Sequence, residues 1–357
     1  MLIRAAPFQV IEYSAGLLLK RGCTEVAIDG ESAVVVIRLI LDQLSNGPAS
    51  PEALLNLFAR EDAEAVSDLL TYLLDRHLLV PATDPEEGRP LPPGTPPGRD
   101  VFYWHFGTTT YRVAEQVTQQ AVAVIGVNRV SRSFVRALQE EGVRDIRVVD
   151  YSPLRNHELM GPQGSEEAWP PALPEIRAFR ADEAAGLFSG VNCLVAASDF
   201  GGWQLLAPWN RQAVERDLHF LPLILENLIG WVGPLVIPGR TACLSCLRAR
   251  LDSHLPQPEL RRLVDSAAQA GKAVAGGHPF MADLVGMVGA SEILKFYNRI
   301  PGWQVGQTIE VNLLTAHMTP RRVLRVPRCP VCSSLGRTPS LDPAMRTPLA
   351  LSGSGPE

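Results

Sequence analysis

Two pairs of cysteines constrain this chain more than any other feature of its sequence. Each pair is a C-x-x-C, Cys243-Leu-Ser-Cys246 and Cys329-Pro-Val-Cys332. This spacing lets two thiolates of one tight turn reach the same tetrahedral ion, and two such pairs complete a closed site of the kind that holds structural zinc. We therefore predict that Cys243, Cys246, Cys329 and Cys332 bind zinc and tie two distant segments together. Four unrelated buried thiols, or two redox pairs, are the alternative interpretations.

Length and charge limit the class of protein. The chain has 357 residues, 46% hydrophobic and 20% charged, as expected for a globular protein of two or three domains. Its net charge of −5 argues against a surface made for nucleic acid. No apolar run reaches the roughly 18 residues of a membrane span, and the first residues lack a signal-peptide layout. We expect a cytoplasmic protein with reduced thiols and no membrane or nucleic-acid partner.

Proline-rich composition divides the chain. Residues 81–100 contain seven prolines, too many for a helix or a central strand, so they indicate an extended spacer. We predict four parts: a first domain at 1–82, a linker at 83–100, a larger domain at 101–337 and a disordered tail at 338–357.

The sequence pattern of residues 1–82 predicts a small winged-helix-like unit of three strands and three helices. Short apolar runs separated by turns predict an antiparallel meander, and helical spacing of apolar residues follows. Ser50 before Pro51 is a typical helix start. His77 continues an apolar stripe, which favours packing at a helix end over metal binding. The predicted strands are Phe8–Tyr13, Gly16–Lys20 and Thr24–Asp29, and the helices are Glu31–Leu44, one from Pro51 and Ala63–His77.

After the linker, strands alternate with helices, which predicts a doubly wound α/β domain. Ala121–Ile125 is apolar throughout, as expected of a buried parallel strand. The other predicted elements are a helix at Ser131–Glu141, strands at Asp145–Asp150 and Asn192–Ala197, and a helix at Ala282–Tyr297.

The turn after the first strand of this domain argues against a nucleotide site. A dinucleotide-binding turn needs several glycines so that backbone amides approach phosphate, but here only Gly126 is present. The residues at 127–130 carry side chains into the space that a phosphate would use. Asp150 ends the next strand, where an acidic residue often meets a ribose, and Arg129 and Arg155 are candidate phosphate ligands. We expect at most a degenerate site here and no ATP on this chain.

The order of these features resembles the ThiF/MoeB/ubiquitin-activating superfamily over about residues 105–335. The similar segments are residues 142–150, residues 197–200, Asn210 and residues 233–246, which end in the first cysteine pair. The resemblance implies an adenylating fold in which Asp199 takes the magnesium position and Gly126 and Asp150 belong to the nucleotide site. The missing glycines, and the lack of a well-placed catalytic cysteine between the pairs, depart from the active members.

A narrower resemblance accounts for these departures. A winged-helix unit, a linker, a degenerate ThiF-like domain and the ending at residues 323–332 are together similar to the ocin-ThiF-like or cyclodehydratase C proteins. The resemblance implies a non-catalytic partner in the biosynthesis of ribosomal, post-translationally modified peptides (RiPPs). Such a protein binds the precursor's leader through a RiPP recognition element and activates a YcaO enzyme, here a separate protein, that makes azolines. It also implies a homodimer.

Under this resemblance the leader adds as a strand beside Thr24–Asp29, because an extended peptide satisfies an exposed sheet edge by main-chain hydrogen bonds. The adjoining pocket would lie between that strand and the helix Ala63–His77. The facing of the strand is left open, and the core of the domain is the alternative role for its apolar members. The candidate contacts are Thr24, Glu25, Val26, Ala27, Ile28, Asp29, Leu69 and Leu73.

Two other functions compete with leader binding. A true adenylating enzyme would activate a C-terminal carboxylate with ATP; Asp150 and Asp199 favour it, and the broken glycine turn opposes it. A winged-helix DNA-binding regulator would need a basic recognition helix. The third helix instead carries acidic residues and one arginine.

Overall fold

The computed structural model describes residues 1–82, 97–156, 169–179, 184–270, 272, 276–300 and 305–333. Within it the chain forms two compact units, Met1–Val117 (unit 1) and Thr118–Glu357 (unit 2). The predicted disordered tail at 338–357 lies outside the described residues, as does most of the predicted linker; its last residues, from Pro97, open a helix. No helix in the described ranges is long and apolar enough to cross a membrane.

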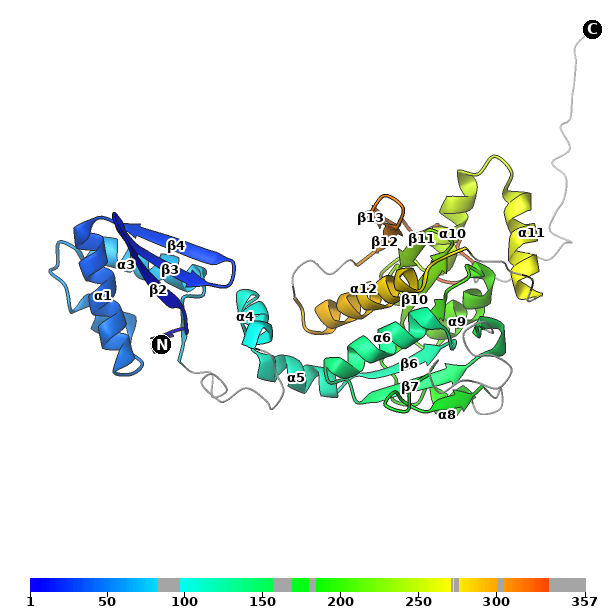
Figure 1. Ribbon diagram of the computed structural model, residues 1–357, viewed down its shortest axis with the longest axis horizontal. Helices are drawn as coiled ribbons and strands as arrows, with labels where there is room; N and C mark the ends of the chain where they lie inside the picture. The colour runs from blue at the N-terminus through cyan, green and yellow to red at the C-terminus, as the bar shows by residue number, and fades with distance from the viewer. Residues whose placement is uncertain are drawn as a thin grey trace, which may run out of the picture. The chain divides into compact units, whose positions relative to one another are not determined.

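Unit 1 contains a three-stranded antiparallel sheet of order β2-β3-β4 and a two-stranded pair, β1-β5 (Figure 1). The predicted strand at Thr24–Asp29 and the start of the helix at Glu31 are confirmed. The β1–β5 pair was not predicted, because three-residue strands carry no readable period. The elements are β1 (Ile3–Ala5), β2 (Gln9–Tyr13), β3 (Gly16–Arg21), β4 (Thr24–Asp29), α1 (Glu31–Ser45), α2 (Pro51–Leu55), α3 (Ala63–Asp75), β5 (Leu79–Pro81), α4 (Pro97–His105) and α5 (Thr110–Thr118).

The core of unit 1 follows the side-chain alternation of its strands. Leu17 and Leu19 on β3 and Val26 and Ile28 on β4 turn inward, where they meet the buried faces of α1 and α3. Since successive strand residues point to opposite faces, Glu25, Ala27 and Asp29 face water. Ser50 caps α2 as predicted, with its side chain accepting a hydrogen bond from the amide of Ala53.

Helix α4 packs onto this core. Trp104 is buried with it, and the guanidinium of Arg21 lies 4.6 Å from the centre of the Trp104 ring. Arg21 also donates to Asp100 at 3.2 Å. His77, just beyond the end of α3, meets Trp104 edge-on with ring centroids 6.4 Å apart, so it packs as predicted rather than joining a metal cluster.

Unit 2 is built on an eight-stranded sheet of order β13-β12-β11-β10-β9-β6-β7-β8. Five neighbouring strands, β10, β9, β6, β7 and β8, pair in parallel. The sheet continues beyond β10 with β11, β12 and β13, which pair antiparallel. Its strands are β6 (Ala121–Ile125), β7 (Asp145–Asp150), β8 (Ile176–Ala178), β9 (Cys193–Ser198), β10 (His219–Glu226), β11 (Ile229–Val232), β12 (Gln307–Asn312) and β13 (His317–Arg322).

Helices cover both faces of this sheet. On one face α6 and α12 lie side by side, and Gly286 permits their close approach because a Cβ there would stand 2.5 Å from the carbonyl oxygen of Val130 (Figure 1). On the other face α9 packs against alternate residues of β6, β9 and β10. The helices are α6 (Arg129–Glu140), the short 3₁₀ turn η1 (Ser152–Leu154), α8 (Ala184–Leu187), α9 (Trp203–Glu215), α10 (Leu244–Ser253), α11 (Pro258–Gln269) and α12 (Pro279–Tyr297).

Candidate functional site

The four predicted cysteine ligands converge on one buried point of unit 2. Cys243 and Cys246 come from the start of α10, and Cys329 and Cys332 from a turn after β13. All four sulfur atoms lie within 4.8 Å of one another. The Sγ–Sγ separations are 3.9 Å for Cys243–Cys246, 3.6 Å for Cys243–Cys329 and 3.4 Å for Cys246–Cys332.

These separations fit a tetrahedral zinc ion. Four sulfurs at a Zn–S distance of about 2.3 Å stand about 3.8 Å apart, within the observed range. The amide of Val326 donates to Cys246 Sγ at 3.3 Å, which orients one ligand. The sulfur atoms are close enough to interact, and the contact between Cys243 and Cys246 lowers the pKa of Cys246 while it raises the pKa of Cys243. The cluster therefore has the donors and the spacing of a closed structural site.

The crevice at the carboxyl end of β6 is filled by the chain's own side chains. Gly126 has φ +101°, and a Cβ there would stand 2.7 Å from the carbonyl oxygen of Ala197, so only glycine fits this turn. Asn128 is fully buried and caps α6: its Oδ1 accepts from the amide of Ser131, and its Nδ2 donates to Leu154 O and Ala197 O. Asn128 thus joins three chain segments at the carboxyl end of β6.

Asp199 directly follows β9, and its carboxylate lies at the amino-terminal end of α6. Its Oδ2 accepts from the backbone amide of Arg129 at 3.1 Å and from Asn156 Nδ2 at 2.9 Å. Burial raises the pKa of Asp199, although these hydrogen bonds oppose the shift. A helix amino terminus is a ready site for an anion, and here the protein supplies the anion itself. Among the described residues, sequence reasoning missed Asn156, because nothing local links it to Asp199.

The remaining nucleotide candidate is paired as well. Arg155 Nε donates to Asp150 Oδ1 at 3.0 Å, so a predicted ribose ligand and a predicted phosphate ligand bind each other. The structure thus brings Gly126, Asp150 and Asp199 to one end of the sheet, where Asp150 binds Arg155 and Asp199 Oδ1 is buried without a hydrogen-bond partner among the described residues.

In unit 1 the edge of β4 presents unpaired backbone. Gly30 N donates to Ala15 O, which continues the β3–β4 ladder by one pair. Because hydrogen-bonded pairs alternate in an antiparallel ladder, the backbone groups of Glu25, Ala27 and Asp29 point away from β3. Within the described part of the chain β4 has a neighbouring strand on one side alone.

The side chains of the predicted peptide-contact set divide into two kinds. Val26, Ile28 and Leu73 are buried in the core of unit 1, so their side chains already have partners. Thr24 and Leu69 are partly exposed, and Glu25, Ala27 and Asp29 are exposed. The exposed side chains of Glu25 and Asp29 bind Lys20 and Tyr13, respectively.

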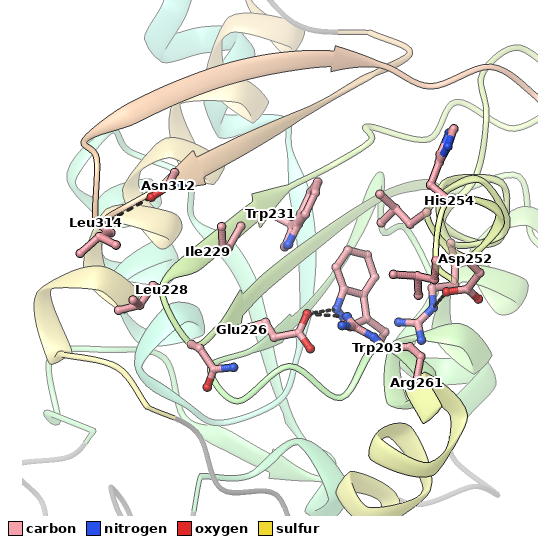
Figure 2. A pocket seen from close by; sticks show the side chains of 14 residues that line it. Trp203, Glu226, Leu228, Ile229, Trp231, Asp252, His254, Arg261, Asn312 and Leu314 are labelled. Carbon is pink, nitrogen blue, oxygen red and sulfur yellow. Dashed lines mark hydrogen bonds and ion pairs between the residues drawn. The ribbon is translucent and has the colours of Figure 1, made fainter. Parts of the chain in front are cut away.

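A second crevice of unit 2 is open. It is a pocket of about 660 Å³ at the carboxyl end of β10, with walls from two β-turns, α9, α10 and α11 (Figure 2). Trp203 and Trp231 meet edge-on in its floor with ring centroids 5.6 Å apart. Glu226 accepts from Trp203 Nε1 at 3.0 Å and from Arg261 Nη2 at 2.6 Å. We refer to it below as the α11 pocket; sequence reasoning did not predict it.

Comparisons with known proteins identify the fold. No protein-family model and no curated protein matches the chain. Escherichia coli MccB, crystallised with AMPCPP and MccA, matches at TM-score 0.65 and 16% identity over 93% of this chain and 99% of its own. MccB with succinimide matches at TM-score 0.66 and 15% identity, over 95% and 100%. The heterocyclase TruD matches at TM-score 0.58 and 19% identity over 93% of this chain but 43% of its own length. The chain therefore has the mixed α/β fold of MccB.

Proposed function

We propose that this chain binds the leader of a ribosomal precursor peptide and presents it to a separate YcaO-type cyclodehydratase that makes azolines. The open backbone of β4 carries the proposal. Glu25, Ala27 and Asp29 offer outward donors and acceptors at every second residue, which is the pattern that an added peptide strand needs. In this proposal unit 1 is the winged-helix-like RiPP recognition element.

The hydrogen bonds at the end of β6 in unit 2 support a role as a non-catalytic partner over a role as an enzyme. A nucleotide at the end of β6 would have to displace Asn128 and the carboxylate of Asp199 from hydrogen bonds that they already make. The zinc centre would then hold the shape of this unit, and the chain itself would not bind ATP. Among the structural neighbours, MccB has been crystallised with the peptide MccA, and TruD is a heterocyclase. We also propose a homodimer in the cytoplasm.

The test is fluorescence anisotropy of labelled leader peptides, taken from short open reading frames beside this gene and titrated with the full chain. We expect saturable binding without ATP and stimulation of the YcaO protein's ATP hydrolysis by the complex. Absence of binding for every candidate leader would overturn the leader-binding function.

A second function, adenylation of a C-terminal carboxylate, has one observation in its favour: MccB has also been crystallised with ATP. Exchange of labelled pyrophosphate into ATP by the full chain, with and without peptide, separates the two. Exchange that depends on Asp199 would establish the enzyme and overturn the partner role.

A further inference from the structure

The α11 pocket has a size and an apolar lining that suit a small organic group. Its volume is about 660 Å³, within the range of roughly 300–1,000 Å³ that ligand pockets occupy. Trp203 and Trp231 form the floor, and leucines from three separate loops also line it (Figure 2). These leucines, Leu228, Leu255 and Leu314, are 39%, 38% and 75% exposed. An aromatic or aliphatic group in the pocket would therefore remove apolar surface from water.

One wall of the pocket carries a buried donor that has no acceptor. Arg248 lines the pocket and is 8% exposed. Its Nη2 donates to Asp265, and its Nε lies 3.0 Å from a carboxylate oxygen of Asp252. Its Nη1 is buried and has no hydrogen-bond partner among the described residues. Because a buried donor without an acceptor is destabilising, this nitrogen favours a ligand that brings an acceptor oxygen.

The charges around the pocket limit the kind of acceptor. The ion pairs here join two arginines and three carboxylates, those of Arg248, Arg261, Glu226, Asp252 and Asp265. The extra carboxylate disfavours an anionic ligand, because like charges repel. Within the described chain Glu226 accepts both of its hydrogen bonds at Oε2, so Oε1 stays available as an acceptor. A neutral carbonyl suits Arg248, and a neighbouring N–H suits Glu226.

We propose that the α11 pocket binds a neutral carboxamide that carries one aliphatic or aromatic group. The carbonyl oxygen accepts from Arg248 Nη1, the amide N–H donates to Glu226 Oε1, and the apolar group lies against the tryptophan floor. Both polar groups lie beside Trp203: the Arg248 guanidinium is 5.6 Å from its ring centre, and Glu226 accepts from its Nε1 at 3.0 Å. All lining residues belong to unit 2, so the inference goes beyond leader binding at β4 and does not rest on it.

The first test is ligand-observed NMR of the full chain with acetylated amino-acid amides. N-acetyl-phenylalaninamide and N-acetyl-leucinamide should bind saturably, with dissociation constants on the order of a millimolar for ligands of this size. N-acetylglycinamide, which lacks the apolar group, and N-acetyl-phenylalanine, which carries a carboxylate, should each bind roughly tenfold more weakly or worse. No saturable binding by either apolar amide, or equal binding of the carboxylate, would overturn the proposal.

The same chemistry has two sources, a small free amide and an apolar residue inside a peptide. An acetylated and amidated tripeptide with phenylalanine between two glycines separates them. If the pocket takes a residue of a peptide, the tripeptide competes with N-acetyl-phenylalaninamide in the same NMR experiment. Binding of the single amide without competition by the tripeptide assigns the pocket to a small free amide.

Substitutions locate the binding at this pocket. Leu255→Asp places a charge in the apolar lining and should weaken N-acetyl-phenylalaninamide roughly tenfold or more. Leu324→Asp is the matched control, because Leu324 is an exposed leucine of unit 2 outside the pocket lining. Arg248→Lys keeps the positive charge but removes Nη1, and it should weaken the amide as well. Circular dichroism confirms that each variant is folded. Unchanged binding by Leu255→Asp, or equal weakening by Leu324→Asp, would contradict a site in the α11 pocket.

Discussion

The edge of the three-stranded sheet in unit 1 and the centre of the eight-stranded sheet in unit 2 differ in the hydrogen-bonding groups that they leave unpaired. In unit 1 the three-stranded sheet ends at β4, whose outward backbone groups have no neighbouring strand in the described chain. In unit 2 the central strands β6 and β9 are paired on both sides, buried on both faces, and capped at the end of β6 by Asn128 and Asp199. The β4 edge offers hydrogen bonds to a ligand, whereas the central strands of the larger sheet have used theirs internally.

This difference bears on where function lies in a two-part protein. A doubly wound sheet normally binds its ligand at the carboxyl ends of its strands. Here Asn128 and Asp199 make internal hydrogen bonds at one such position, and likeness of fold to MccB does not by itself assign a ligand. The proposed function places peptide recognition in unit 1 and a structural role in unit 2, and the predictions below test that division.

The largest effect is expected from loss of a zinc ligand in unit 2. Structural zinc contributes about 10–16 kcal/mol of apparent binding free energy in small domains, which is as large as the whole stability of a typical protein, about 5–15 kcal/mol. Cys246→Ser should therefore lose metal and solubility. Metal content by atomic emission and the yield of soluble protein are the measurements, with Cys23→Ser, away from the cluster, as the control. A stable, metal-free Cys246→Ser protein would contradict the structural role.

A selective effect is expected from proline on β4. Ala27→Pro removes an amide that points to the open edge, and proline is tolerated at such positions because no ladder bond is lost. We expect leader binding to fall below detection in the anisotropy titration while zinc content stays at one ion per chain. Ala27→Thr keeps the amide and should bind. Unchanged binding by Ala27→Pro would show that the peptide does not add to β4.

A substitution in the core of unit 1 should lower the stability of that unit, whereas the proline substitution on β4 should affect leader binding. Leu73 is 1% exposed, so Leu73→Ala should cost unit 1 about 2–5 kcal/mol through lost burial and a cavity. Hydrogen exchange of β3 and β4, read by mass spectrometry of the full chain, measures that loss. Tyr72→Ala, an exposed change on the same helix, should have little effect. If Leu73→Ala kept full protection but lost leader binding, Leu73 would be a peptide contact rather than a core residue.

The smallest effect is expected at Asp199. Burial raises its pKa in the folded state, so the folded protein takes up a proton at higher pH than the unfolded chain does. The stability of wild type relative to Asp199→Asn should therefore rise as pH falls from 7 toward the unfolded pKa of about 3.9. Thermal melts of both proteins across this range, with the exposed Glu215→Gln as control, test the sign. A relative loss of wild-type stability toward low pH would refute it.

The predictions made from sequence succeeded where the signal was local. The C-x-x-C spacing placed four sulfurs together, the alternation in Thr24–Asp29 matched β4 residue for residue, and the apolar run at Ala121–Ile125 is β6. After Gly126, the side chains of Val127, Asn128 and Val130 are buried; the absence of a nucleotide stays a prediction.

The remaining features depend on partners far apart in the chain. Ile3 pairs with Pro81, and Asn156 holds Asp199; neither pairing leaves a local pattern. From its sequence, α11 would be expected to be an ordinary amphipathic helix whose leucines are buried. The structure instead turns Arg261 inward, because the carboxylate that binds it lies on β10.

The separation of the two cysteine pairs along the chain also has a consequence in time. Cys332 lies 86 positions after Cys246. At a synthesis rate of about 5–20 residues per second, the first cysteine pair waits on the order of 4–17 seconds for the second. During that interval the growing chain carries two reduced thiols that no ion yet holds in a closed site. Unit 1, by contrast, has left the ribosome before either pair is made, so the open edge of β4 is expected to be ready before the four cysteines of unit 2 can meet.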